Sequence, residues 1–226
     1  EDDRWKYLWN GLGVTLQLTF CAVLIGIVLG VILAMIRSTY DKNYQEMRPG
    51  FGRFMLKILN VIAKIYLTVI RGTPVVVQLM IMYYIILASS NNKLLVGMIA
   101  FGVNSGAYVA EIVRGGIMSV DAGQMEAGRS LGMNYTQTMR HIIIPQAIKN
   151  ILPALGNEMI TLLKDTSLMT VTGAKDLMKA AQSVTAVTYQ PLMPYISIAI
   201  IYLVCVMALS KALAAFERRL RNSDRR

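Results

Sequence analysis

The chain has 226 residues, of which 55% are hydrophobic and only 16% are charged, and its mean hydropathy is +0.49. This composition is too apolar for a soluble globular domain and indicates a membrane protein. The 23 Lys and Arg outnumber the 13 Asp and Glu and give a net charge of +10, which in a soluble chain would suggest a nucleic-acid binder. In so apolar a chain the charge is better interpreted against a bilayer, and we expect no nucleic-acid partner.

Long uncharged segments predict an all-α protein that crosses the membrane about five times. Residues 7–36 carry no formal charge, and about 20 residues suffice to cross the hydrocarbon core. The second window is residues 72–92, but its apolar part, Val75–Ala88, needs the residues before Arg71 to complete a crossing. The other three spans are expected from Leu94 into Met118, from Pro153 to Thr172, and from Pro194 to Leu209.

Residues 53–70 have Lys57 and Lys64 seven residues apart, with apolar residues filling the other turns. This pattern is typical of an amphipathic helix at the cytoplasmic interface. The alternative is that the segment forms the first half of one long second span.

Lys and Arg are unevenly distributed between the segments that connect the spans. Residues 37–57, residues 120–150 and the tail from Lys211 contain 14 of them, whereas the alternating segments contain six. Because cytoplasmic loops hold the excess of Lys and Arg, we expect the C-terminus in the cytoplasm and the N-terminus outside. Residues 1–226 are then one transmembrane domain with a cytoplasmic loop at residues 120–145.

That loop is a polar passage between apolar spans and is expected to form a hairpin of two short helices. Asp121 can cap the first helix, with Gln124 three residues on to complete a capping box. Gly132 supplies the left-handed residue that ends it. Asn134 caps the second helix, again with a glutamine three residues later, and Pro145 limits the continuation of that helix.

The hairpin resembles the signature of permease subunits of ABC importers: Glu-Ala-Ala, three residues, Gly, nine residues, Ile, one residue, Leu-Pro. At that spacing this chain has Glu126, Ala127, Gly128, Gly132, Ile142, Ile144 and Pro145. Gly128 stands in place of the second alanine and Ile144 in place of the leucine. The resemblance implies that the loop docks into a cleft of an ATPase subunit, with Glu126 in contact and Gly132 forming the turn. The alternative is an ordinary helical hairpin that happens to fit.

Three further stretches resemble permeases for polar amino acids: RGTPVVVQL at 71–79, AYVAEIVRGGIMSVDAGQMEAGRSLGM at 107–133, and NEMITLLKDTSL at 157–168. The resemblance covers nearly the whole chain from about residue 11, and it implies the type I importer permease fold. It further implies an importer of the bacterial inner membrane that works by alternating access. ATP and Mg are then held by separate ABC ATPase subunits, and this chain binds no cofactor.

Polar residues in or beside the spans are the candidates for a solute pathway. Pro74 removes a backbone donor and Gly72 loosens the helix, so a kink is expected beside the membrane. Thr73 and Gln78 could offer hydrogen bonds to a polar solute at this break. The alternative is a simple interface turn in which Arg71 pairs with lipid headgroups.

Charged residues within the spans complete the candidate set. Glu111 and Arg114 share one helix face and are expected to form a structural ion pair, with a role in transport as the alternative. Glu158 is expected to face a solute or water pathway, because an unpaired charge near a span's centre costs about 3 kcal/mol. A hydrogen bond between subunits is its alternative role. Nearer the outer mouth we place Asp165, Thr166 and Ser167, which follow Lys164.

The remaining expectations concern partners and rival functions. The outward segments are too short to enclose a ligand, and five spans alone make a poor pore. The resemblance therefore implies an extracytoplasmic solute-binding protein and a second permease subunit, identical or paralogous, in the lipid membrane. A rival function, that of an intramembrane enzyme, would have only Glu158, Lys164 and Asp165 as catalytic candidates. The two remaining rivals are a membrane adaptor protein and a permease for another small polar solute.

Overall fold

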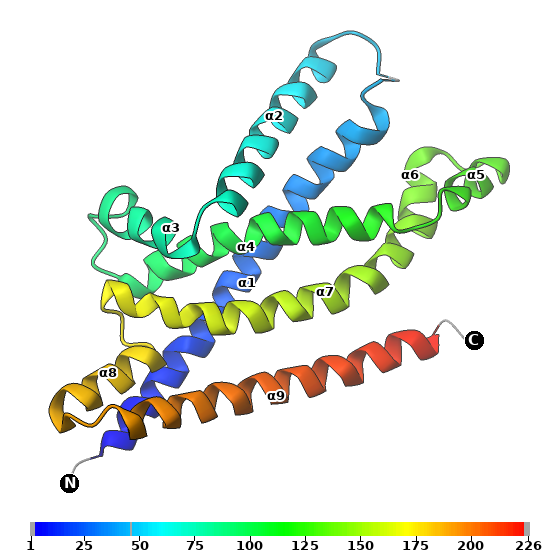
Figure 1. The fold of residues 1–226 in the computed structure, drawn as a ribbon. Helices are drawn as coiled ribbons and strands as arrows, with labels where there is room; N and C mark the ends of the chain where they lie inside the picture. Colours follow the sequence, from blue (N-terminus) through cyan, green and yellow to red (C-terminus); the bar gives the residue numbers. More distant parts are fainter. Residues whose placement is uncertain (1–2, 46, 224–226) are drawn as a thin grey trace.

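The computed structural model describes residues 3–45 and 47–223, which are almost entirely helical (Figure 1). The helices are α1 (Arg4–Asn43), α2 (Phe51–Gly72), α3 (Val75–Ile81), α4 (Lys93–Met118), α5 (Ala122–Ser130), α6 (Tyr135–Thr138), α7 (Ile144–Asp165), α8 (Leu177–Thr188) and α9 (Leu192–Ser223). Two π-helical turns, Met82–Ile86 and Met139–Ile143, follow α3 and α6, and a 3-10 helix, Thr166–Thr172, follows α7.

Three of the expected spans are confirmed as long apolar helices. Within the described residues, Trp5–Lys42, Lys93–Met118 and Leu192–Leu220 are each long and apolar enough to cross a membrane. They belong to α1, α4 and α9, which contain 40, 26 and 32 residues. α1 and α9 extend beyond their uncharged segments. A helix can continue past the membrane into water where its polar residues favour helical structure.

The second span is broken where the sequence predicted a kink. α2 alone has 22 residues and ends at Gly72, and α3 with its π turn leaves it at an angle of 111°. Thr73 adopts an extended conformation, as a residue before proline does, and Pro74 lacks the N–H that would continue the helix. The kink predicted at Gly72 and Pro74 is therefore confirmed, and α2 with α3 forms a broken span or a re-entrant loop.

The predicted fourth span is not supported: among the described residues, no helix in this region is apolar enough to count as a candidate membrane span. α7 covers Ile144–Asp165 instead of Pro153–Thr172, and the residues from Thr166 form a 3-10 helix. Pro145 directly follows the π turn Met139–Ile143, and Pro153 is accommodated inside α7. Because a π turn joins α6 to α7, the chain is helical from Tyr135 to Asp165, and the predicted stop at Pro145 is wrong.

α1 and α4 are packed together in parallel through small residues. Gly26 faces Ser105 and Gly30 faces Val109, so residue numbers rise together along both helices. A Cβ atom built on Gly30 would lie 2.5 Å from Cγ1 of Val109. Small residues allow such close approach of helices in a bilayer, where packing replaces the hydrophobic effect. α7 runs antiparallel to α4, because Ile151 packs on Gly116 while Glu158 reaches Ser105.

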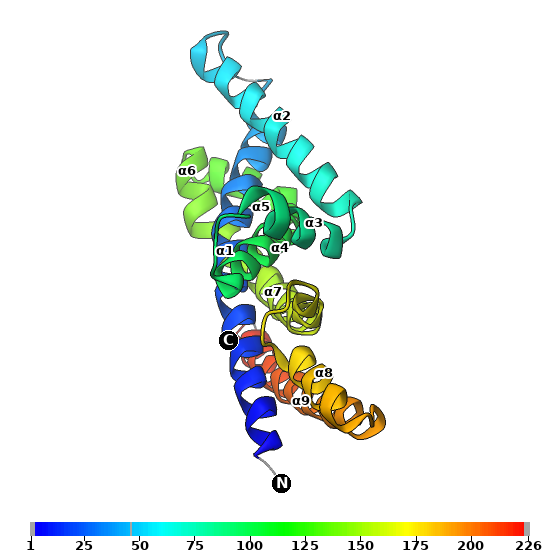
Figure 2. The ribbon, with the colours of Figure 1, turned by 90° about the vertical axis from the view of Figure 1, so that its left-hand side faces the viewer.

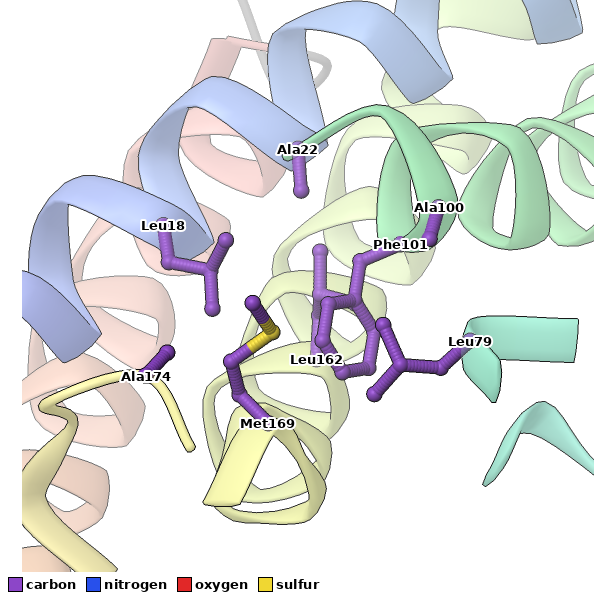
Figure 3. Close-up of a cluster of buried hydrophobic side chains, with 8 residues drawn as sticks. All are labelled: Leu18, Ala22, Leu79, Ala100, Phe101, Leu162, Met169 and Ala174. Carbon is purple, nitrogen blue, oxygen red and sulfur yellow. The ribbon is translucent and has the colours of Figure 1, made fainter. Parts of the chain in front are cut away.

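A cluster of buried apolar side chains packs α1 and α4 against α3, the short helix that follows the break at Pro74 (Figure 3). Leu18 from α1, Phe101 from α4 and Met169 from the 3-10 helix are fully buried in it. Leu79 of α3 points into the same cluster, so the short helix after the break is anchored to the bundle. The position of α3 is therefore fixed by packing, which matters for the polar contacts described below.

The two ends of the bundle differ. The α5–α6 hairpin, the loop between α1 and α2 and the end of α9 lie toward one side in Figure 1, and α3, α8 and the start of α1 lie toward the other. Figure 2 views α4 and α7 nearly end-on, with the α1–α2 pair extending beyond them. This two-sided arrangement is what a chain with alternating crossings produces.

Candidate functional site

The first helix of the hairpin begins with a side-chain cap, although not with the predicted capping box. An Asp121 carboxylate oxygen accepts a hydrogen bond from the Gly123 N–H at 2.7 Å. The Gln124 side chain does not return to Asp121: its Oε1 accepts a hydrogen bond from Nε2 of Gln146 at 3.3 Å. The expected role of Gln124 is thus wrong, and the side chain connects α5 to the start of α7 instead.

The turn and the second helix follow the prediction. Gly132 has φ of +79°, a left-handed conformation that favours glycine, and the Met133 N–H donates to the Gly128 carbonyl at 3.0 Å. Asn134 and Gln137 form a reciprocal capping box, with both hydrogen bonds at 2.9 Å. The hairpin is therefore a rigid unit between the end of α4 and the start of α7.

The residues of the sequence signature divide between two faces of α5. Glu126 and Ala127 are exposed, and so is Leu131, whose side chain is 78% accessible. Gly128 is buried against Thr138 of α6, which is itself fully buried. Gly128 thus holds the hairpin together, while the Glu126 carboxylate and the Leu131 side chain just after α5 are exposed.

Replacing Gly128 by alanine, the residue of the family signature, is expected to strain the hairpin. The added Cβ would lie 2.5 Å from Cγ2 and 2.7 Å from Oγ1 of Thr138. Such overpacking costs about 1–3 kcal/mol. The double variant Gly128→Ala/Thr138→Ala removes both atoms and should recover the thermal stability of the detergent-purified protein. If the single variant melts like the wild type, or the double variant is no better than the single one, this packing argument is wrong.

Four polar side chains form what we call the polar seam: Gln78 of α3, Asn104 and Ser105 of α4, and Glu158 of α7. The Ser105 hydroxyl donates to a Glu158 carboxylate oxygen at 2.9 Å, and Nδ2 of Asn104 donates to Oε1 of Gln78 at 2.8 Å. Asn104 and Ser105 are buried, whereas Glu158 is half-buried. The seam joins three helices at neighbouring positions of α4 and leaves Glu158 accessible along one side.

Gln78 and Thr73 close the break between α2 and α3. Nε2 of Gln78 lies 2.7 Å from the Ile70 carbonyl, 3.0 Å from the Thr73 carbonyl and 2.7 Å from Oγ1 of Thr73. The Thr73 hydroxyl in turn donates to the Val69 carbonyl at 2.8 Å. These bonds satisfy backbone groups that the missing helical turn leaves free. Both side chains are thus engaged within the chain at the predicted break.

The remaining candidates lie at the end of α7. Asp165 is seven residues after Glu158 and so shares its helix face, about 10 Å farther along the axis. The buried Thr166 hydroxyl donates to the Leu163 carbonyl at 2.6 Å and therefore belongs to the helix end. Asp165 and Ser167 are half-buried. The structure places these three residues beyond the polar seam rather than within it.

The pair Glu111 and Arg114 is part of a larger set of ion pairs. Their charged groups are 3.4 Å apart, while Arg114 also lies 3.5 Å from Asp41 of α1 and Glu111 lies 3.8 Å from Arg71 of α2. The groups are partly exposed, so each pair stabilises the fold only weakly. Their arrangement nevertheless fixes three helices to one another, and Arg71 has a partner within the chain.

Sequence reasoning missed Asn104, Ser105 and Asp41. Asn104 and Ser105 are adjacent polar residues in the middle of the uncharged run 94–110, and that interruption was an available signal. No signal in the sequence pointed to Asp41, because its ion-pair partner Arg114 is distant in sequence. Among the described residues, no group of three or more His, Cys, Asp or Glu side chains could hold a metal ion.

Comparison with known proteins places this arrangement in a family. The family profile described as binding-protein-dependent transport system inner membrane component matches residues 49–222. The arginine transport system permease protein ArtQ of Bacillus subtilis (strain 168) is 38% identical over 96% of this chain and 94% of its own length. The glutamine transport system permease protein GlnP of Escherichia coli (strain K12) is 38% identical, over 76% of this chain and 81% of its own.

Solved structures agree with the fold. A crystal structure described as an amino acid ABC transporter with histidines has a TM-score of 0.84 and 44% identity, covering 95% of this chain and 94% of the other. An inward-facing MetNI methionine ABC transporter has a TM-score of 0.76 at 19% identity, covering 97% and 99%, which supports the fold alone. The all-α permease fold is therefore confirmed, and the chain belongs to the family of inner membrane components of binding-protein-dependent transport systems.

Proposed function

We propose that the chain is the permease subunit of an ATP-driven importer for polar amino acids, which moves its solute by alternating access. One observation carries the proposal: the helical path from the capped hairpin runs without interruption through the π turn into α7, which bears Glu158. A displacement of the hairpin is thus transmitted along one rigid element to a carboxylate inside the membrane. The exposed Glu126 is the point at which an ATPase subunit would act.

The chemistry of the seam supports the choice of solute. The half-buried Glu158 carboxylate accepts a hydrogen bond from Ser105, the one side-chain bond seen for it among the described residues, and it retains capacity for an ammonium or guanidinium donor. Relatives are named for arginine and glutamine transport, and a solved relative is described with histidines. We infer a cationic or zwitterionic amino acid, with Asp165, Thr166 and Ser167 nearer the outer end and Thr73 and Gln78 at the break.

The orientation follows from the basic residues and the two ends of the bundle. Lys and Arg are concentrated in the loop after α1, the hairpin region and the tail of α9, which lie toward one side (Figure 1). This side is the cytoplasm on the positive-inside rule. The membrane is then the bacterial inner membrane, and the N-terminus lies on its outer side.

The partners follow from what the chain lacks. Because its sequence has no phosphate-binding loop, energy must enter through separate ABC ATPase subunits that hold ATP and Mg. A second permease, identical or paralogous, completes the pathway, and an extracytoplasmic binding protein delivers the solute. ATP binding would draw the hairpins of the two permeases together and open the pathway outward, and hydrolysis would reset it.

The substitution Glu126→Lys tests this proposal in the assembled transporter, reconstituted in liposomes with its ATPase and binding protein. We expect normal membrane insertion, uptake reduced to background and loss of solute-stimulated ATP hydrolysis, because the charge reversal opposes docking of the hairpin. Glu217→Lys on α9 makes the same charge change outside the hairpin and should transport normally. Unchanged uptake and ATP hydrolysis in Glu126→Lys would overturn the coupling assignment.

A further inference from the structure

A pocket of about 630 Å³ opens at the face of the bundle where α1 and α4 begin. Its apolar lining comes from Val14 of α1, Leu94 of α4 and Ala174 in the segment before α8. The polar part of the lining consists of Asn91, Asn92, Lys93 and Lys175. The volume is that of a small-ligand site, and the mixed lining suits a molecule with a polar and an apolar part.

The pocket lies at the boundary between apolar and charged sequence. Lys93 is the last charged residue before the uncharged run 94–110, and Leu94 is the first residue of that run. Val14 belongs to the uncharged segment 7–36 of α1. Lysines at such a boundary extend toward the headgroup layer while their methylene groups cover apolar surface. The pocket is therefore level with lipid headgroups, on the face that our proposed orientation places outside.

The two lysines have no carboxylate partner among the salt bridges of the described residues. The neighbouring Asp176 is fully buried and caps α8, accepting hydrogen bonds from the Lys179 and Met178 N–H groups at 3.0 and 3.3 Å. Nζ of Lys93 leans toward the opposite wall, since a Cβ atom built on Gly173 would lie 3.1 Å from it. Lys93 Nζ also lies 5.9 Å from the centroid of the Tyr83 ring, an uncharged partner. Two positive charges thus line a site beside which Asp176 is turned inward.

We propose that this pocket binds the phosphate-bearing headgroup of an anionic phospholipid. The ammonium groups of Lys93 and Lys175 would pair with the phosphate, and the amide groups of Asn91 and Asn92 would donate to headgroup oxygens. Oδ1 of Asn92 already accepts the Leu95 N–H at 3.1 Å, which leaves its NH₂ group to donate. An acyl chain would follow the apolar lining. This site is independent of the proposed transport function.

A lipid fits these observations better than an acidic protein surface. A folded partner approaching from water would meet the exposed Lys175, but it would not reach Val14, inside the apolar segment of α1, or Leu94, the first residue of the apolar run of α4. An amphiphile already in the membrane contacts both parts at once. The charge of the pocket also requires an anionic headgroup and disfavours a neutral one, because near a membrane surface each lysine contributes about 1 kcal/mol toward anionic lipid.

Native mass spectrometry of the full-length protein in neutral detergent tests the site, with phosphatidylglycerol as the probe and phosphatidylcholine as the neutral comparison. We expect one saturable phosphatidylglycerol adduct. The variant Lys93→Gln/Lys175→Gln should weaken its affinity about thirty-fold, and Lys175→Gln alone about five-fold. Lys179→Gln removes a lysine of the adjacent α8 that does not line the pocket, and it should bind like the wild type.

Several outcomes would overturn the proposal. If Lys179→Gln lowers the affinity as much as Lys175→Gln does, the lipid is attracted by the general positive charge of this surface and not by the pocket. Equal affinity for phosphatidylcholine would exclude recognition of an anionic group. Displacement of the lipid by millimolar inorganic phosphate would identify a free anion as the occupant. Because Lys175 is exposed, its single variant is expected to fold normally, and an unchanged adduct in that variant would also contradict the site.

Discussion

Replacing Gly30 of α1 by leucine is expected to abolish the folded state. The Cβ atom alone would lie 2.6 Å from Cβ of Val109 and 2.8 Å from the backbone nitrogen of Ala110, and the backbone of α4 cannot move aside. The helices would have to separate along their parallel interface, at a cost of more than about 3 kcal/mol. In a bilayer, water does not drive them back together, so the variant should be lost from the monodisperse fraction on size-exclusion chromatography in detergent.

Gly13 provides the matched control, because it lies in the same helix and a Cβ atom built on it has no neighbour within 4 Å. Gly13→Leu should therefore purify and melt like the wild type. A difference between the two variants separates the effect of close packing from the effect of glycine on helix propensity, which would shift both alike. If Gly30→Leu is monodisperse and as stable as the wild type, α1 and α4 do not pack as described.

The contrast between these glycines shows what the sequence could and could not reveal about the fold. Uncharged runs were enough to locate α1, α4 and α9, because the membrane requires an apolar length and little else. The close face of α1 was not predicted, since Gly13 and Gly30 look alike until the position of α4 is known. An apolar run in the sequence identifies a helix, but it does not show which glycine of that helix packs closely against a neighbouring helix.

The boundaries of the second and fourth spans were the hardest to predict, for a common reason. Both segments carry charges and prolines, so hydropathy gave weak boundaries for them. Pro74 breaks the helix, as predicted, because the proline ring forces Thr73 before it into an extended conformation, whereas Pro145 and Pro153 are both contained in α7. The difference depends on hydrogen bonds from elsewhere: Gln78 satisfies the carbonyls freed at the break. The presence of a proline in the sequence does not reveal whether a donor such as Gln78 is available to the freed carbonyl groups.

The hairpin was the most predictable part of the candidate site, because caps are local. Asn134 finds its partner Gln137 three residues away, and Gly132 needs only its own backbone conformation. Glu158 could be selected as an isolated charge, but its partner Ser105 is 53 residues away and could not. Local capping chemistry was therefore predicted almost in full, and the contacts within the polar seam required the fold.

Neutralising Glu158 is expected to separate its roles in stability and transport. In Glu158→Gln, the amide oxygen can still accept the hydrogen bond from Ser105, so the seam between α4 and α7 should survive. The negative charge that would receive a solute ammonium is lost, together with a charged hydrogen bond of about 1.5–3 kcal/mol. Uptake by the reconstituted transporter should fall roughly ten- to hundred-fold, while the melting temperature and basal ATP hydrolysis remain unchanged.

Two further variants distinguish a role of Glu158 in transport from a role in stability. Asn157→Ala changes the exposed neighbour of Glu158 on α7 and should transport normally. Ser105→Ala removes the donor but keeps the carboxylate, so it should lower stability more than it lowers uptake. If instead Glu158→Gln transports like the wild type while Ser105→Ala and Glu158→Ala are equally unstable, then Glu158 serves only to hold α4 to α7. In that case the solute must be recognised elsewhere along the pathway, and Asp165, on the same face of α7, becomes the carboxylate to substitute next.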